Sequence, residues 1–271
     1  MKIGFFDSGI GGMTVLHQAL KHLPNEDYIF YADTLHVPYG EKSKEEVREY
    51  IFQAADFIAS QGVKALVIAC NTATSIAVED LRRKYDFPII GIEPAVKPAI
   101  QSSEKKHKKV LVMATELTLK EEKFCNLVKK MDHQDVVESI PMPGLVRLAE
   151  SFEFSEAIVE SYLQETLAHL DLTQYGTVVL GCTHFPYFEK SIRNVFPDGT
   201  DVISGSIGTA RNLKRILEAK GQLNDGTGQI TFYQSGCQVE EKALLRKYQD
   251  LFKRLDEPLF ASNSPEQKIA Q

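Results

Sequence analysis

The chain has 271 residues, enough for two domains of ordinary size that each bury a core. Its net charge of -6 argues against a nucleic-acid partner, because phosphate binding normally needs a clustered basic surface. A small-molecule ligand fits this composition better.

The sequence predicts neither a signal peptide nor a membrane span. The start of the chain has a single basic residue, Lys2, and no segment approaches the roughly 20 apolar residues that a span needs. We therefore expect a cytoplasmic protein with no membrane partner. The four cysteines lie far apart without a Cys-x-x-Cys pair, so we predict free thiols and no metal site. They are Cys70, Cys125, Cys182 and Cys237.

Strands and helices alternate through the first third of the chain. Apolar runs predict strands at residues 2–7, 28–31, 65–69 and 88–91, and helical spacing predicts helices at residues 13–22, 44–60 and 74–85. The helix at 44–60 carries its apolar residues on one face, as in an amphipathic helix. The β/α alternation predicts a largely parallel sheet with helices on both faces.

A second α/β domain is expected from residue 96 to residue 206. After a proline-containing segment at 93–98 and a charged stretch at 102–109, the pattern predicts strands, a turn and helices. The expected strands are 110–114, 135–139 and 177–180, the turn is 141–144, and the helices are 119–131, 145–150, 155–170 and 185–196. Residues 207–261 are expected to rejoin residues 1–95 in the first domain, through a helix at 209–220, a strand at 229–234 and a helix at 239–255. Residues 262–271 are expected to form a flexible tail.

Two cysteines stand at matching places in this pattern. Cys70 and Cys182 each end an apolar strand and precede a helix, with polar residues directly after them. The ordinary role of a cysteine is that of a small core residue, which we assign to Cys125 and Cys237. A thiol at a helix start has its thiolate stabilised by the helix dipole, which predicts a pKa lowered from about 8.5 toward neutrality.

Polar residues follow the other strand ends as well. Asp7 and Ser8 precede a glycine turn that lacks the third glycine of a dinucleotide fingerprint and the lysine of a P-loop, so we interpret it as a turn whose backbone N–H groups approach a small anion. Thr115 follows the strand at 110–114. Since ligands of open parallel sheets bind at the carboxyl ends of the strands, these residues and both thiols are expected around one site. His184 lies two positions from Cys182 and is a candidate proton relay.

The motifs together resemble those of the bacterial glutamate racemases in the aspartate/glutamate racemase superfamily. The resemblance rests on segments that match in order along most of the chain. They are Asp7-Ser8-Gly9-x-Gly11-Gly12, Pro38-Tyr39-Gly40, Ala69-Cys70-Asn71-Thr72-Ala73-Thr74, Ala114-Thr115-x-x-Thr118 and Gly181-Cys182-Thr183-His184-x-Pro186. It implies two doubly wound α/β domains related by pseudo-twofold symmetry, with the active site in the cleft between them.

The resemblance also implies a reaction and a set of roles. The reaction would be racemisation of glutamate without a cofactor, supplying D-glutamate for peptidoglycan, with Cys70 and Cys182 as the acid/base pair on opposite faces of the substrate. Asp7, Glu150 and His184 would tune the thiols, and analogy with the family would make a homodimer possible. The implied substrate-binding residues are Asp7, Ser8, Tyr39, Gly40, Asn71, Thr72, Thr115, Thr118, Thr183 and His184.

Three other interpretations stay open from the sequence. A racemase for another acidic amino acid, such as aspartate, would use the same thiols. A module that only binds an amino acid between two lobes would use the same hydroxyl and amide residues, but it has no need of paired thiols. A thiol redox sensor would require the fold to bring Cys70 and Cys182 together.

Overall fold

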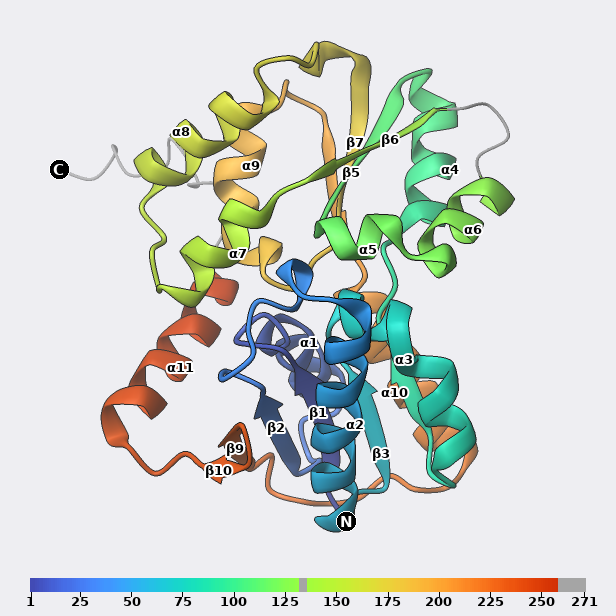
Figure 1. The fold of residues 1–271 in the computed structure, drawn as a ribbon, viewed down its shortest axis with the longest axis vertical. Coiled ribbons are helices and arrows are strands. Elements are labelled where there is room, and N and C mark those ends of the chain that lie inside the picture. The colour runs from blue at the N-terminus through green and yellow to red at the C-terminus, as the bar shows by residue number, and fades with distance from the viewer. Residues whose placement is uncertain (132–135, 258–271) are drawn as a thin grey trace, which may run out of the picture.

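The structure is a computed structural model that describes residues 1–131 and 136–257. It contains two β-sheets, each flanked by helices, stacked one above the other (Figure 1). The predicted α/β class with parallel sheets is confirmed. The expected tail at 262–271 lies outside the described residues.

The larger sheet has six strands in the order β10-β9-β2-β1-β3-β4. All neighbours pair in parallel except the short edge strand β10, which is antiparallel to β9. The predicted return of the late strand to the first sheet is borne out, since β9 pairs with β2. The strands are β1 (Ile3–Asp7), β2 (Tyr28–Ala32), β3 (Ala65–Ile68), β4 (Ile89–Gly91), β9 (Ile230–Gln234) and β10 (Cys237–Gln238).

The smaller sheet has four parallel strands in the order β6-β5-β7-β8. They are β5 (Lys109–Ala114), β6 (Val137–Pro141), β7 (Tyr175–Leu180) and β8 (Asp201–Ser204). This order repeats the β2-β1-β3-β4 part of the larger sheet, strand for strand. Cys70 follows β3 and Cys182 follows β7, so the two thiols occupy equivalent places in two copies of one topology.

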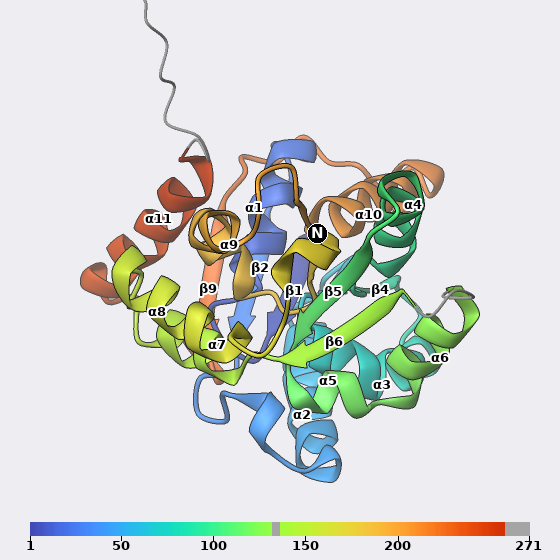
Figure 2. The same ribbon diagram turned by 90° about the horizontal axis from the view of Figure 1, so that it is seen from above.

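Helices cover both faces of each sheet. The helices α2 and α3 pack on one face of the larger sheet, while α1, α10 and α11 cover the other. Viewed from above, α4 and α6 lie on one side of β5 and β6, and α8 and α9 on the other (Figure 2). The helices are α1 (Met13–His22), α2 (Lys44–Ser60), α3 (Asn71–Lys84), α4 (Val96–Lys106), α5 (Glu116–Lys120), α6 (Glu122–Met131), α7 (Pro143–Glu150), α8 (Glu156–Leu167), α9 (Glu189–Val195), α10 (Ser206–Ala219) and α11 (Lys242–Asp256), with short 3-10 turns η1 (Tyr39–Glu41), η2 (Leu172–Gln174) and η3 (Phe185–Phe188).

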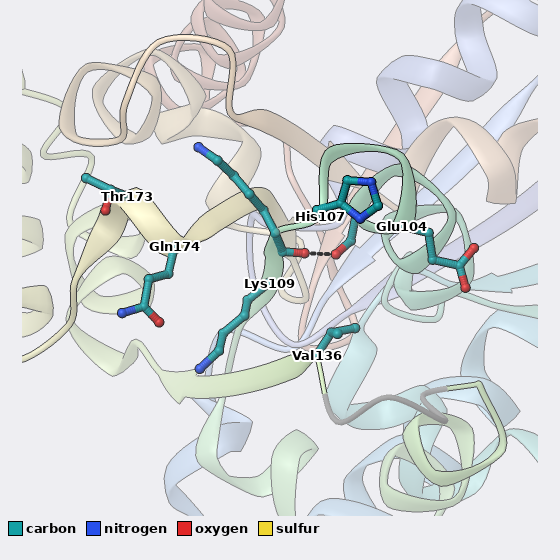
Figure 3. Close-up of a pocket in the computed structure, with 8 residues that line it drawn as sticks. Glu104, His107, Lys109, Val136, Thr173 and Gln174 are labelled. Carbon is teal, nitrogen blue, oxygen red and sulfur yellow. Dashed lines mark hydrogen bonds between the residues drawn. The ribbon is translucent and has the colours of Figure 1, made fainter.

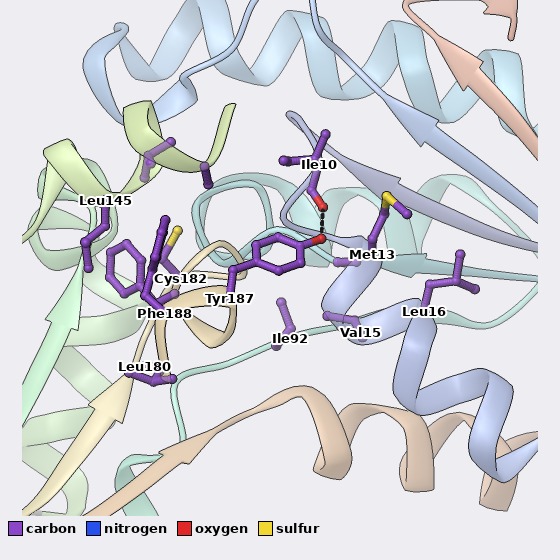
Figure 4. Close-up of a cluster of buried hydrophobic side chains, with 14 of the residues drawn as sticks. Ile10, Met13, Val15, Leu16, Ile92, Leu145, Leu180, Cys182, Tyr187 and Phe188 are labelled. Atoms are coloured by element: carbon purple, nitrogen blue, oxygen red, sulfur yellow. Dashed lines mark hydrogen bonds between the residues drawn. The ribbon is translucent and has the colours of Figure 1, made fainter. Parts of the chain in front are cut away.

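One hydrophobic cluster runs from the larger sheet into the smaller unit. It contains Met13 of α1 together with Cys182, Tyr187 and Phe188, which follow β7 (Figure 4). The Tyr187 hydroxyl donates a hydrogen bond of 2.9 Å to the backbone carbonyl of Ile10. The packing therefore holds the segment after β7 directly over the turn after β1.

Several predicted boundaries were wrong. The segment predicted as a charged connection contains helix α4, whose apolar residues Val96, Ala99 and Ile100 are buried while its charged end is exposed. The helix predicted at 119–131 is two helices, α5 and α6, because the chain is extended at Glu121. The predicted turn at 141–144 ends β6 and begins α7, and the helix predicted at 185–196 is η3 followed by α9. Strand β8 was not predicted. The first residue of the strand predicted at 135–139 lies outside the described residues.

Candidate active site

Both strand-end thiols line one small cavity between the two sheets. Its volume is about 20 Å³, which is room for about one water molecule. The segments after β1, β3, β5 and β7 all contribute to its wall, as expected for the carboxyl ends of parallel strands. The lining residues are Ser8, Pro38, Tyr39, Gly40, Cys70, Asn71, Thr72, Thr115, Val146, Cys182, Thr183 and His184.

Cys70 is the N-cap residue of α3. Its Sγ accepts a hydrogen bond of 3.5 Å from the backbone N–H of Ala73 and lies 3.9 Å from the Ser8 hydroxyl. That hydroxyl donates in turn to Oδ1 of Asp7 over 3.1 Å. The predicted change from strand to helix at Cys70 is thus confirmed, although α3 begins at Asn71 and not at residue 74 as predicted. A hydroxyl and a carboxylate line up behind the sulfur.

Cys182 has a different set of neighbours. Its Sγ lies 3.5 Å from Nδ1 of His184, and Nε2 of the same ring lies 2.5 Å from Oε1 of Glu150. Burial acts to lower the pKa of His184, but the hydrogen bonds to Cys182 and Glu150 outweigh it and hold that pKa well above its ordinary value. A cationic imidazole therefore stands beside the second thiol.

The expectation of a lowered pKa was wrong for Cys70. Burial raises the pKa of its thiol, and the nearby Asp7 carboxylate adds to the effect, while the Ala73 N–H acts in the opposite direction. The dipole argument considered only the local helix start. Complete removal from water disfavours the thiolate more than one backbone N–H stabilises it.

Asp7 links the two halves of the site. Its Oδ2 accepts a hydrogen bond of 2.8 Å from the hydroxyl of Thr183, and its Oδ1 accepts from the backbone N–H of Gly9 over 3.0 Å. Burial raises the pKa of Asp7 to about 6, although His184 and these hydrogen bonds act to lower it. The carboxyl group is therefore poised to titrate in the mildly acidic range.

The glycine turn brings the two halves close together. The N–H of Gly9 serves Asp7 and the N–H of Ile10 donates to Glu150 over 2.8 Å, so these two groups bind protein carboxylates and not the external anion that we expected. A Cβ on Gly9 would lie 1.8 Å from Oε1 of Glu150, and one on Gly11 would lie 2.5 Å from Nδ1 of His184. Only glycine permits this approach.

Three threonine hydroxyls form a closed triangle beside the cavity. Thr72, Thr115 and Thr118 are linked by hydrogen bonds of 2.9 to 3.0 Å. Thr72 and Thr115 line the cavity, whereas Thr118 lies behind them. Asn71 is 5% exposed and lines the same wall, and neither polar atom of its side chain has a hydrogen-bond partner among the described residues. Such an amide is available to a ligand.

The structure brings the predicted site residues together, some lining the cavity and others directly behind the lining. Asp7, Glu150 and Thr118 touch the lining residues from behind, and the other predicted residues line the cavity itself. Two lining residues were missed, Pro38 and Val146. Pro38 lies in a motif that we had singled out, whereas nothing in the sequence distinguishes Val146 from a core residue of α7.

Features of the described residues outside this cavity do not add to the candidate site. A surface pocket near Glu104, His107, Lys109 and Gln174 lies at the amino-terminal ends of β5 and β7, the opposite end of the sheet from Cys182 (Figure 3). Among the described residues, no cluster of His, Cys, Asp and Glu side chains is suited to hold a metal ion. In the same part of the chain, no helix combines the length and apolarity of a bilayer span.

Comparison with known proteins identifies the family. The model of the Asp/Glu/hydantoin racemase family matches residues 8–211. Glutamate racemase 2 of Bacillus subtilis is 63% identical over 257 residues, covering 95% of this chain and 97% of that protein.

Solved structures agree in fold. Glutamate racemase from Thermus thermophilus, solved with β-chloro-D-alanine, gives a TM-score of 0.75 at 32% identity over 94% of this chain and 93% of that one. The enzyme from Francisella tularensis, solved with D-glutamate, gives a TM-score of 0.77 at 30% identity over 93% and 92%. The chain therefore belongs to the Asp/Glu/hydantoin racemase family and, within it, to the glutamate racemases.

Proposed function

We propose that this protein interconverts L- and D-glutamate with Cys70 and Cys182 as the two acid/base groups, and that it supplies D-glutamate for peptidoglycan. The observation that carries the proposal is that both thiols line one cavity from equivalent strand ends of two matching sheets. Racemisation removes a proton from one face of the α-carbon and returns one to the other face. Two bases across a cavity accomplish this directly, and a binding module needs neither.

The environments of the two thiols differ, and we assign their roles in the reaction from these neighbours. Cys70, whose pKa is raised by burial and by Asp7, rests as the neutral thiol. Cys182 contacts the cationic His184, which stabilises a thiolate. In the L-to-D direction the Cys182 thiolate takes the α-proton, the Cys70 thiol donates its proton to the opposite face, and the charge ends on Cys70. The cycle closes when Cys70 regains a proton, for which Ser8 and Asp7 supply a relay, and Cys182 releases to solvent the proton that it took.

The cavity walls supply the remaining chemistry. The α-proton of an amino acid is weakly acidic, so the site must stabilise a carbanion-like transition state. We assign this to fixed dipoles around the α-carboxylate, namely the unpartnered amide of Asn71 and the hydroxyls of Ser8, Thr72 and Thr183. Removing one such donor from an oxyanion site costs about 10²–10³ in kcat in other enzymes.

Substrate entry requires the two halves to separate. Glutamate has ten heavy atoms, whereas the cavity holds about one water. Two ion pairs link the two units near the Tyr39–Gly40 segment, one between Lys44 and Glu121 at 2.7 Å and one between Glu41 and Arg147 at 2.5 Å. The Glu41–Arg147 pair is exposed at both ends, so it contributes at most about 1 kcal/mol and does not prevent opening. In the Lys44–Glu121 pair only the lysine is exposed, because the Glu121 side chain is 7% exposed. Closure over the substrate would exclude water during proton transfer.

Asp7 is predicted to make both the free energy of unfolding and the activity depend on pH. Its pKa is 3.8 in the unfolded chain and about 6 in the folded one, so its contribution favours folding below pH 3.8 and is lost as the pH rises to about 6. Asp7→Asn should therefore raise the free energy of unfolding at pH 7.5 by about 1–3 kcal/mol, while abolishing the acidic limb of kcat/KM near pH 6. Urea titrations and pH–rate profiles check both effects. Unchanged stability together with an unchanged acidic limb would contradict the assignment.

The assignment of glutamate as the substrate is tested with purified protein and no added cofactor. We expect the circular dichroism of either glutamate enantiomer to decay to zero, because the two enantiomers have equal free energy. Aspartate is the matched rival substrate and should be racemised far more slowly. Racemisation of aspartate with glutamate unchanged would identify the rival enzyme, and tight binding of glutamate without racemisation would identify a binding module.

We further propose the division of the chain and its assembly. Of the described residues, those within 1–95 and 207–261 form the first domain and those within 96–206 the second, which assigns each sheet and its thiol to one domain. The partner is a small amino acid in the cytoplasm, and the protein is proposed to form a homodimer. Light scattering at several protein concentrations tests that state, and a monomer mass throughout would exclude it.

A further inference from the structure

The wall segment that carries Tyr39 and Gly40 is held by a residue near the end of the chain. Strand β9 pairs with β2 so that Gln234 lies opposite Ala32, which places the next residue, Ser235, beside Asp33. The N–H of Ser235 donates to the carbonyl of Ala32 over 2.9 Å. The hairpin of β9 and β10 thus lies against the loop that leads from β2 to the cavity (Figure 1).

Asp33 is the point where the hydrogen bonds of this loop meet. Its carboxylate is buried, with 4% side-chain exposure. It accepts hydrogen bonds from the Tyr39 hydroxyl at 2.6 Å, from the Ser235 hydroxyl at 3.0 Å, and lies 2.8 Å from Nδ1 of His36. The Ser235 hydroxyl also accepts a 3.0 Å bond from the N–H of Leu35. Ser235 therefore fixes both the carboxylate and the loop backbone.

Tyr39 depends on this arrangement. Its ring is 1% exposed and packs near Phe6 and Tyr50, at centroid distances of 6.3 and 6.2 Å. Burial and the neighbouring Asp33 raise the pKa of Tyr39 far above its usual range, so the hydroxyl keeps its proton and donates a hydrogen bond to Asp33. Gly40 follows directly and lies against Thr115, where a Cβ would come within 2.8 Å of the threonine Cβ. A shift of Tyr39 would move this part of the wall.

We propose that Ser235 is a positioning residue for substrate binding, which acts through Asp33 on the Tyr39–Gly40 wall of the cavity. The proposal rests on the proposed function, since it assumes that this wall contacts the substrate. The segment carries neither thiol, so displacement of the wall weakens binding of substrate and transition state alike. Loss of such uniform binding raises KM and leaves kcat nearly unchanged.

The test compares Ser235→Ala with Ser235→Gly and with Ser60→Ala. Ser235 has a φ of 42°, so the glycine variant removes the hydroxyl while relieving the backbone, and it separates lost hydrogen bonds from strain. Ser60 donates a comparable 2.7 Å bond to Phe57 at the far end of α2 and serves as the matched control. Both Ser235 variants lose the hydrogen bond to Asp33 and the one from Leu35. They should raise KM for glutamate by at least about fivefold, the effect of losing one hydrogen bond, with kcat within about a factor of two. Ser60→Ala should change neither.

A double variant tests the route through Asp33. Because the hydroxyls of Tyr39 and Ser235 donate to the same carboxylate, the KM effects of Tyr39→Phe and Ser235→Ala should be less than multiplicative when combined. Wild-type KM in either Ser235 variant, or a fully multiplicative double variant, would overturn the positioning role. Failure of the wild-type protein to racemise glutamate would instead overturn the proposed function, so the two outcomes are distinct.

Discussion

Cys70→Ser and Cys182→Ser should each lower kcat for glutamate racemisation by about 10²–10⁴-fold in both directions, the range for loss of one acid/base group. Both thiols line the same cavity, and the other two cysteines, Cys125 and Cys237, lie outside it and cannot replace either of them. Serine keeps the size of the side chain, so far-UV circular dichroism and the melting temperature should stay close to those of the wild type. Cys125→Ser is the matched control, since Cys125 lies on α6, outside the cavity.

Each single variant should also keep the ability to remove the α-proton from one enantiomer only. Cys182→Ser retains Cys70 and should exchange the α-proton of D-glutamate with solvent without inverting it, whereas Cys70→Ser should exchange only L-glutamate. Proton NMR in D2O follows the two exchanges separately. Near-normal racemisation by either variant would refute the two-base assignment. Exchange of the α-proton of both enantiomers by one variant would refute the assignment of each thiol to one face of the α-carbon.

His184→Asn is predicted to have the second largest effect. The imidazole ring lies between Cys182 and Glu150, and its raised pKa keeps it cationic beside the sulfur. Asparagine can still donate a hydrogen bond but carries no charge, so the Cys182 thiolate loses its counter-ion in a buried site. We expect kcat/KM to fall by about 10²-fold or more, comparable to removal of one charge-stabilising group.

The two directions of the reaction provide an internal control for His184→Asn. Since the enantiomers have equal free energy, kcat/KM must fall equally from L- and D-glutamate, while the separate kcat values are free to diverge. His169→Asn, at an exposed position, should leave all of them unchanged. Glu150→Gln should lower kcat/KM less than His184→Asn does, because glutamine can still form a hydrogen bond with the imidazole ring but carries no negative charge. A His184→Asn variant with kcat/KM near that of the wild type would exclude the cationic role.

Local patterns predicted much of this site because its chemistry sits at strand ends. An apolar run that stops at a polar residue locates a strand end from sequence alone, and Cys70, Thr115 and Cys182 all follow this pattern. Parallel pairing then brings the ends together without further information. The family motifs supplied the roles, and the structure supplies the distances behind them.

What the sequence did not predict depends on contacts between distant segments. The raised pKa of Cys70 comes from burial by both halves of the protein, which no local pattern encodes. The amides of Gly9 and Ile10 are bound by carboxylates, one of them 140 positions away in Glu150. Helix α4 was missed because its charged end obscured three buried apolar residues, and Ser235 lies 202 positions from Asp33.

The central claim is that two different groups handle the proton on the two faces of one carbon. It is tested most directly by starting the reaction in D2O from each pure enantiomer and measuring α-deuterium in substrate and product at early times by mass spectrometry. A two-base enzyme places solvent deuterium in the product while the remaining substrate keeps its protium. Product that retains the original α-proton would show that a single base carries it from face to face, and would contradict the account given for Cys70 and Cys182.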